Sequence, residues 1–306
     1  MKMKIGLLSA ILPDNTYEEV IDIAKQYGYE AVEIACWPKE NKSRRYAGIS
    51  HIDIEQLDES KAKHILKYAK ENDIEISALG YYPNPLDPNE SKREKYINHI
   101  KKLITAAKTL NVNRISTFIG KNQFLSDEEN FELFKKYWPD IIDFAEQNKV
   151  YVGIENCPMY FTKDEWPGGQ NLASSPHNWK KMFQIIPSKY FGLSYDPSHL
   201  YFQRMDYIKP LNEFKERIFH IHFKDIKLLD DKLNEYGIFT EPLNYMKPKI
   251  PGEGGIDWSL FVKELFKTGY HLCGCIEIED KDYEYSQKGI HKAIENSINH
   301  IKKFIE

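Results

Sequence analysis

A closed barrel of eight parallel strands, each followed by a helix, is the fold that this sequence predicts. Eight short apolar runs alternate with amphipathic stretches along the chain, which is the pattern of repeated β/α units. Several of the amphipathic stretches begin with residues that cap helices. No Gly/Ser/Pro-rich linker separates the two halves, so one TIM-barrel domain covering residues 1–306 is expected.

The predicted strands are short and apolar, as strands buried on both faces of a parallel sheet are. In chain order they cover residues 5–9, 31–35, 76–80, 114–118, 152–155, 191–195, 219–223 and 275–278. The spacings Thr16–Glu19, Ser91–Glu94 and Ser126–Glu129 are typical of capping boxes, and apolar residues at helical spacing follow each. These three segments therefore predict helix starts.

The composition excludes several classes of protein. Hydrophobic residues make up 42% of the chain and charged residues 29%, as in a folded protein with a sizeable core. The net charge of −4 gives no electrostatic reason to bind nucleic acid. No run approaches the roughly 20 apolar residues of a membrane span, and the start has no signal-peptide core. A cytoplasmic location without membrane or nucleic-acid partners is expected.

The four cysteines occupy apolar segments. Cys273 and Cys275 form a C-x-C pair, but no second Cys/His pair stands at zinc-site spacing. Buried thiols are the expected state of Cys36, Cys157, Cys273 and Cys275.

Two connections are too long for simple barrel loops, which usually have about 2–6 residues. They are residues 158–176, which include Trp166, and residues 227–255. Both follow strands that carry polar residues at their ends. Since functional loops gather at the carboxyl end of a barrel, these connections after strands five and seven are expected to form lids over a substrate.

Polar residues at the ends of strands five and six predict part of an active site. Alternate side chains of a barrel strand point into the lumen. Alternation places Glu155 inward near the end of strand five and Asp196 inward at the end of strand six. Pro197 then ends the strand, because proline has no N–H to donate. His199 lies just beyond and within reach of the same site.

Strands seven and eight supply the remaining donors. His220 and His222 share the inward face of strand seven, and His222 lies nearer its carboxyl end. On strand eight, Glu277 is the first carboxylate after the apolar residues. Three buried carboxylates around one histidine would repel one another unless a cation lay between them. The sequence therefore predicts one divalent metal ion bound by Glu155, Asp196, His222 and Glu277.

The mostly oxygen-based donors favour manganese, with magnesium, cobalt or zinc as alternatives. On the substrate side of the site, residues in the early connections are expected to line the pocket. These are His51, Tyr81, Tyr82 and Asn84.

Four segments resemble the motifs of strands five to eight in the xylose isomerase-like sugar phosphate isomerase/epimerase superfamily. They are Gly153–Pro158 (GIENCP), Tyr195–Leu200 (YDPSHL), His220–Asp225 (HIHFKD) and Ile276–Asp280 (IEIED). The resemblance implies the same four metal ligands, with Glu155 and Glu277 exchanging the α-proton of a sugar. It also implies substrate-side positions for His199 and Lys224. Trp166, in the first of the two long connections, is expected to bind the substrate as well.

The resemblance implies a metal-dependent sugar isomerase or epimerase that acts through an enediolate. A lyase or hydratase acting on 3-oxo-glycosides or related keto sugars is the alternative, because loss of a β-leaving group from the same intermediate gives elimination. An apurinic endonuclease would need histidines from strands three and four, and neither strand end supplies one. The expected partner is a small carbohydrate, and assembly into homo-oligomers stays open.

Overall fold

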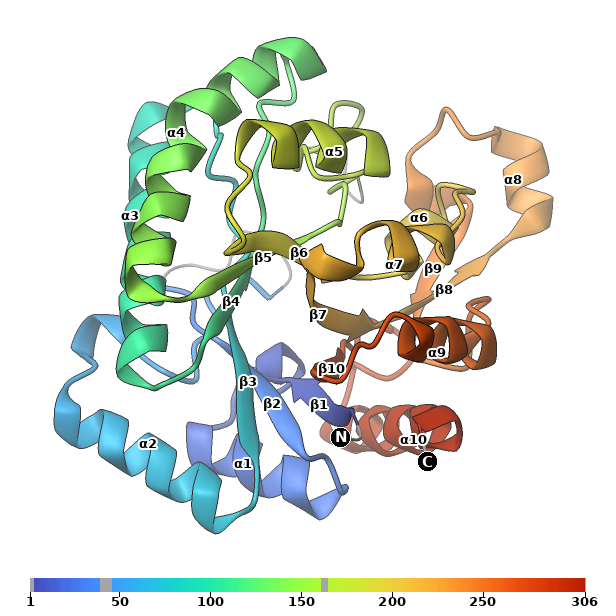
Figure 1. Cartoon of the computed structure of the whole chain (residues 1–306). Coiled ribbons are helices and arrows are strands. Elements are labelled where there is room, and N and C mark those ends of the chain that lie inside the picture. The colour runs from blue at the N-terminus through green and yellow to red at the C-terminus, as the bar shows by residue number, and fades with distance from the viewer. Residues whose placement is uncertain (1–2, 39–45, 161–164, 306) are drawn as a thin grey trace.

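The predicted barrel is present in the computed structural model, which describes residues 3–38, 46–160 and 165–305 (Figure 1). Its strands close in the order β1-β10-β7-β6-β5-β4-β3-β2, and neighbouring strands are parallel. The strands are β1 (Lys4–Leu8), β2 (Ala31–Ala35), β3 (Glu75–Gly80), β4 (Arg114–Thr117), β5 (Tyr151–Glu155), β6 (Phe191–Tyr195), β7 (Ile218–Phe223) and β10 (Cys273–Ile276). All eight predicted runs are confirmed as strands.

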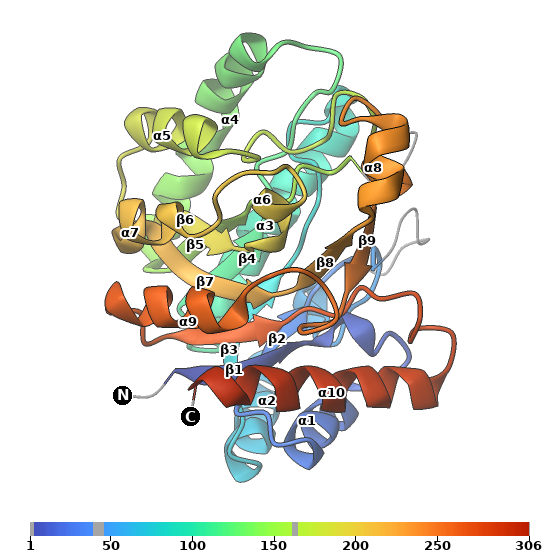
Figure 2. The ribbon, with the colours of Figure 1, turned by 90° about the vertical axis from the view of Figure 1, so that its right-hand side faces the viewer.

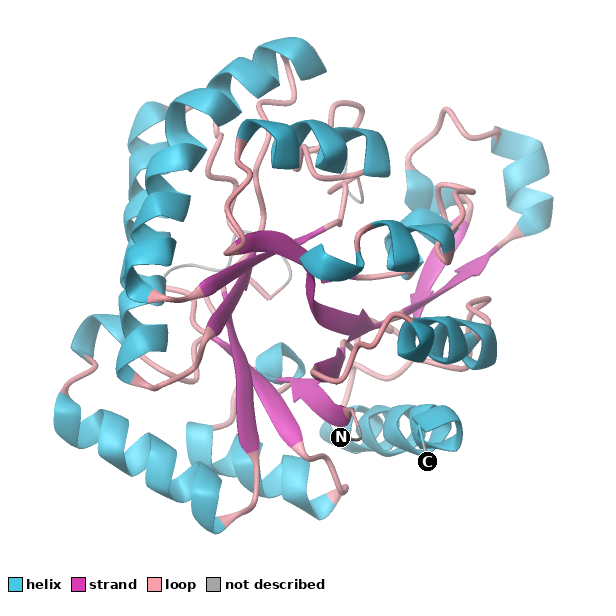
Figure 3. Ribbon diagram, viewed as in Figure 1, coloured by secondary structure: helices cyan, strands magenta, loops and turns pink. Residues whose placement is uncertain are grey.

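Helices surround the barrel on its outside (Figures 1 and 3). They are α1 (Tyr17–Gln26), α2 (Glu59–Glu71), α3 (Glu90–Thr109), α4 (Asp127–Asn148), α5 (Pro176–Ile185), α6 (Ser198–Tyr201), α7 (Lys209–Glu213), α8 (Asp230–Tyr236), α9 (Trp258–Lys267) and α10 (Gln287–Ile305). Short 3-10 turns are η1 (Ser9–Ile11), η2 (Ile54–Gln56), η3 (Lys215–Arg217) and η4 (Pro242–Asn244). No helix in the described ranges is long and apolar enough to cross a membrane.

Two of the three predicted capping boxes are confirmed. Thr16 and Ser126 each accept a hydrogen bond from the backbone of the glutamate three residues later, and that glutamate bonds back. The third prediction is wrong. Asn89 caps α3 by accepting from the backbone N–H of Lys92, so Ser91 lies inside the first turn. Asparagine caps a helix as well as serine does, and here it starts the helix earlier.

The long connection after β7 is more than a loop. It contains β8 (Asp225–Leu228), α8, η4 and β9 (Met246–Lys249), and β8 pairs with β9 in an antiparallel two-stranded sheet. We call residues 225–249 the arm. It stands beside the barrel next to β7 (Figures 1 and 2). Ile226 and Met246 are fully buried together with Tyr245 and with Phe202, so a small apolar cluster packs the arm against the end of α6.

The four cysteine thiols are buried and free, as expected.

Candidate active site

The four predicted metal ligands gather at the carboxyl end of the barrel. Glu155 is the last residue of β5, Asp196 directly follows β6, His222 lies in β7 and Glu277 directly follows β10. All four side chains are buried. Carboxyl ends of parallel barrel strands meet at one rim, which is where the active sites of such barrels lie.

Three of these ligands are close to one another. His222 Nδ1 lies 3.6 Å from Glu277 Oε2 and 4.0 Å from Glu155 Oε1. The three donor atoms all lie within 4.8 Å of one another. Among the described residues, His222 Nδ1 and Glu277 Oε2 have no hydrogen-bond partner. Buried polar atoms are rarely left unsatisfied, so a cation held between these donors fits the site.

Asp196 joins this group through His199. The Nε2 atom of His199 lies 3.1 Å from Asp196 Oδ2 and 3.1 Å from Glu155 Oε1. The side chain of Asn156 accepts from the backbone N–H of Asp196 and donates to its carbonyl oxygen. The ends of β5 and β6 are thereby held in register. Glu155, Cys157 and His199 form a second group of possible metal donors.

The two histidines of β7 differ in their contacts. Both pair with Glu33 through Nε2, and His222 also directs Nδ1 toward Glu155 and Glu277. His220 therefore lies deeper in the barrel than the group of carboxylates, as the alternation of side chains along the strand requires. Glu33, His220 and His222 form a third group of possible metal donors.

Glu33 of β2 is a site residue that sequence reasoning missed. Its Oε2 accepts from His222 Nε2 at 2.8 Å and lies 3.0 Å from His220 Nε2, and its Oε1 accepts from the Tyr82 hydroxyl. A Cβ on Gly80 would meet Glu33 Oε1 at 2.6 Å, so a glycine there leaves room for the carboxylate. The histidines lower the pKa of Glu33 against the opposing effect of burial. Glu33 is thus an anion that orients His222.

Lys224 also lies in the site, as predicted. Its ammonium group is buried, lies 3.2 Å from Glu277 Oε1 and pairs with Glu279. Burial raises the pKa of Glu277 to about 8, and the attraction of Lys224 offsets only part of that rise. A carboxyl group with this pKa holds a proton near neutral pH in the metal-free protein, and an ion that binds it must displace that proton.

A cavity of about 610 Å³ opens above these residues. Both long connections contribute to its walls, the first through Met159 and Glu165 and the arm through Leu243 and Met246. The expected lid segments therefore do border the site, although part of the first connection lies outside the described residues. The other polar lining residues include Glu155, Lys224 and Glu277.

Four predicted substrate-side residues lie elsewhere. The ring nitrogens of His51 bond to Ser9 Oγ and to the carbonyl of Leu12. Tyr81 is buried between the rings of Trp37 and His99.

The other two are Asn84 and Trp166. Asn84 ties two loops together by donating to the carbonyl of Lys121, and Trp166 packs against Tyr160. None of the four is among the described residues that line the cavity, and neither is His199, whereas the neighbouring Tyr82 is.

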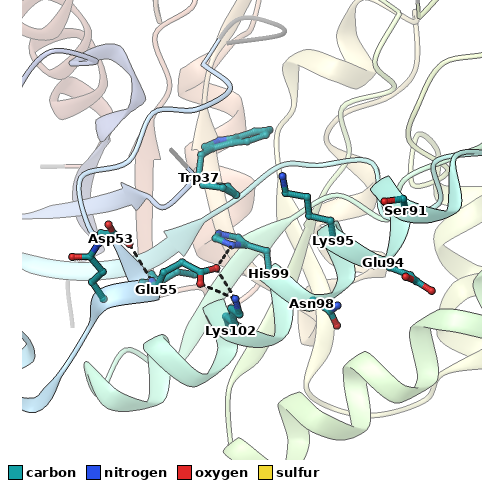
Figure 4. A pocket seen from close by; sticks show the side chains of 12 residues that line it. Trp37, Asp53, Glu55, Ser91, Glu94, Lys95, Asn98, His99 and Lys102 are labelled. Atoms are coloured by element: carbon teal, nitrogen blue, oxygen red, sulfur yellow. Dashed lines mark hydrogen bonds and ion pairs between the residues drawn. The ribbon is translucent and has the colours of Figure 1, made fainter. Parts of the chain in front are cut away.

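A second cavity, of about 660 Å³, lies outside the barrel between η2 and α3 (Figure 4). Its charged groups pair with one another: both carboxylate oxygens of Glu55 accept from Lys102, and Glu55 lies 3.7 Å from His99 Nδ1. Asp53, Glu55 and Glu94 also line this cavity, but among the described residues no three of its possible donors lie close enough together to hold a metal ion. Trp37 lines both cavities.

Comparison with known proteins agrees with this architecture. The family described as xylose isomerase-like TIM barrel matches residues 21–304. The chain belongs to this family. The protein YfiH of Bacillus subtilis (strain 168) is 23% identical, and the match covers 96% of this chain and 97% of YfiH. An inosose dehydratase of Geobacillus thermodenitrificans (strain NG80-2) is also 23% identical, over 56% of this chain and 72% of that protein.

Several solved structures share the fold of this chain. The IolI protein with a bound zinc atom superimposes with a TM-score of 0.72 at 16% identity, covering 99% of both chains. The 3-keto-D-glucoside 4-epimerase YcjR from E. coli superimposes with a TM-score of 0.71 at 14% identity, covering 99% of this chain and all of the other. At such identities the superpositions establish the fold alone.

Proposed function

We propose that this chain is a divalent-metal-dependent enzyme that transfers the proton next to the carbonyl group of a sugar, as a sugar isomerase or epimerase does. The observation that carries the proposal is the group formed by Glu155, His222 and Glu277, buried at the bottom of a cavity with donor atoms within 4.8 Å. A structural neighbour is named 3-keto-D-glucoside 4-epimerase and a relative is named inosose dehydratase. These names support a carbohydrate substrate.

The donors fit a divalent ion. Glu155, His222 and Glu277 would hold it, and Asp196 would complete the set from the adjacent strand. When bound, the ion would polarise the sugar carbonyl and stabilise the negative charge of an enediolate. The preponderance of carboxylates favours manganese, magnesium or cobalt, whereas the zinc of the IolI neighbour and the nearby thiol of Cys157 favour zinc.

The chain's own residues would carry the proton. One of the two glutamates takes the proton from the sugar carbon, and the other returns one to the opposite face for epimerisation. Both carboxylates line the cavity, where they can reach a bound sugar. Lys224, 3.2 Å from Glu277, keeps that carboxylate oriented. His199 is fully buried and contacts both Glu155 and Asp196, so it would act on the sugar through these carboxylates.

A lyase is the second candidate. The relatives named inosose dehydratase favour it, and Lys224 lies between two carboxylates where it could protonate a departing hydroxyl or alkoxide. Both candidates share proton abstraction as the first step. They differ in whether the proton returns to carbon or a bond at the β-carbon breaks.

Solvent exchange tests the shared step. Protein loaded with manganese is incubated with keto sugars and 3-oxo-glycosides in deuterium oxide, and incorporation at the α-carbon is followed by NMR. We expect exchange in the wild type, and its loss by more than the roughly 10²–10⁴-fold of a single acid–base group in Glu155→Gln and Glu277→Gln, because metal binding suffers as well. The matched control is Glu55→Gln in the outer cavity.

Product analysis separates the candidates. An epimer or isomer supports the first, whereas an unsaturated product or release of the β-substituent supports the lyase. His199→Asn is expected to bind the ion normally and to raise KM. Full exchange in either active-site glutamine variant would contradict the proposal.

A further inference from the structure

The inner cavity is larger than a sugar ring needs. A hexose has twelve non-hydrogen atoms, and at the ~30 Å³ that each water molecule takes in the liquid it would fill at most about 360 Å³. The cavity measures about 610 Å³. Space for a further group, on the order of 250 Å³ by the same measure, remains after a sugar has occupied the catalytic end.

Apolar groups make up much of the lining of the cavity, beside charged residues at its rim. One wall comprises Leu8, Ala10 and Ala35, with Tyr46 packed against them. The facing elements β3 to β5 supply a second wall, formed by Tyr82, Phe118, Cys157 and Met159. Sugar hydroxyls placed against such walls would lose water without gaining hydrogen-bond partners, which is costly.

The arm and the rim extend the apolar lining away from the catalytic carboxylates. Leu243, Met246 and Pro248 line the cavity from the arm, and Leu243 is 38% exposed. Trp37 contributes from the rim, where it separates the inner cavity from the outer one. Flat aromatic groups gain favourable energy against rings such as those of Trp37, Tyr82 and Phe118.

Two of the four lysines among the described lining residues are engaged by carboxylates. Lys224 pairs with Glu277 and Glu279, and Lys249 lies 3.2 Å from Asp280. Among the described lining residues, six are acidic and four are basic. Glu155 and Glu277 would be neutralised by the divalent ion, so it is the pairing of Lys224 and Lys249 with carboxylates, and not a surplus of negative charge, that disfavours a phosphate group.

We infer that the end of the inner cavity away from the catalytic carboxylates binds an uncharged aromatic aglycone. The substrate is then an oxidised aryl glycoside rather than a free monosaccharide or a sugar phosphate. The inference rests on the proposed function for the end at which the sugar binds. The catalytic carboxylates hold the sugar, and the apolar walls with Trp37 and the arm hold the aryl group.

Binding without turnover tests the aryl subsite directly. Isothermal titration of manganese-loaded protein compares phenyl glucoside, methyl glucoside and glucose 6-phosphate, none of which carries the reactive ketone. Burial of a phenyl ring is expected to make phenyl glucoside bind roughly ten- to fifty-fold more tightly than methyl glucoside. Equal affinity of the two glycosides, or tightest binding of the phosphate, would overturn the inference.

Substitutions locate the subsite. Trp37→Leu and Leu243→Ser should each reduce the preference for phenyl over methyl glucoside by roughly three- to ten-fold, while methyl glucoside binding, which monitors folding, stays unchanged. Phe239→Leu is the matched control, because Phe239 belongs to the same arm, is 91% exposed and is not among the lining residues. An unchanged preference in both test variants would refute the location.

The two proposals fail in different ways. If phenyl glucoside binds tightly but no 3-oxo-glycoside exchanges its α-proton, the proposed chemistry is wrong and the aryl subsite stands. If free keto sugars exchange but the phenyl group adds no affinity, the subsite is wrong and the chemistry stands.

Discussion

Replacing Glu33 with glutamine tests how the ring of His222 is held. The carboxylate accepts from His222 Nε2 at 2.8 Å, lies 3.0 Å from His220 Nε2 and accepts from the Tyr82 hydroxyl. Because Nε2 is engaged by Glu33, Nδ1, which faces Glu155 and Glu277, is the nitrogen left to bind a metal ion. The glutamine amide would offer only one acceptor oxygen in place of two. Its NH₂ group would face an N–H or O–H donor and could not accept from it.

The expected cost follows from these contacts. A hydrogen bond to a charged group contributes about 1.5–3 kcal/mol, and residues that orient a metal-binding histidine typically change metal affinity by about 10–100-fold. We therefore expect the dissociation constant for manganese to rise by roughly 10–100-fold in Glu33→Gln, or about 1.4–2.7 kcal/mol. The surface variant Glu55→Gln should bind manganese as the wild type does.

Isothermal titration measures the affinity, and ¹⁵N NMR of the imidazole nitrogens reports which one carries the proton. If Glu33→Gln does not fold, Tyr82→Phe removes only the partner of the other carboxylate oxygen and should weaken binding by less than about five-fold. A dissociation constant within twofold of the wild type, with the histidine tautomer unchanged, would refute the role of Glu33.

Three further outcomes are expected. Because burial raises the pKa of Glu277 to about 8, manganese must displace a proton, so its affinity measured by titration should rise about tenfold per pH unit from pH 6 to 8 for each proton released. The same raised pKa makes the metal-free protein bind more protons folded than unfolded, so its stability in urea should fall as pH rises from about 4.5 toward 8. Asp225→Ala would strip the acceptor from the N–H groups of Ile226, Gly252, Ile256 and the Trp258 indole and should cost roughly 3–5 kcal/mol of unfolding free energy by urea denaturation.

The strands could be predicted from sequence because each is buried on both faces. Such strands appear as continuous apolar runs, and the runs at residues 31–35 and 191–195 coincide with β2 and β6. The strand-end donors were predicted from the alternation of side chains along each strand. A polar side chain at an inward position beyond the apolar layer indicates a functional site more often than a packing role. Glu155, Asp196, His222 and Glu277 were predicted together; the structure brings donor atoms of Glu155, His222 and Glu277 within 4.8 Å of one another, and Asp196 lies against His199.

The loop residues could not be placed in the same way. Position after a strand indicates the correct rim of the barrel but does not fix the direction of the side chain. His51 illustrates this: it follows β2, yet both its ring nitrogens are bonded to the η1 segment, to Ser9 and Leu12. Of the adjacent tyrosines, Tyr81 packs into the core and Tyr82 faces the cavity. The packing of neighbouring loops determines which of the two tyrosines faces the cavity, and no local sequence pattern predicts that packing.

Glu33 was missed for a different reason. It stands in the middle of an apolar run, and its partner His222 is 189 residues away. The strands β1 and β10 separate β2 from β7 around the barrel, so the Glu33 side chain reaches His222 across the lumen. Val32 and Ile34 pack into the core shared with the outer helices, which leaves Glu33 as the inward residue between them. A lone charge at the inward position of a strand is the signal that could have revealed it. Because barrel closure brings the two strands together, the orientation of His222 depends on the whole ring of strands, and a change at β2 is expected to act on metal binding.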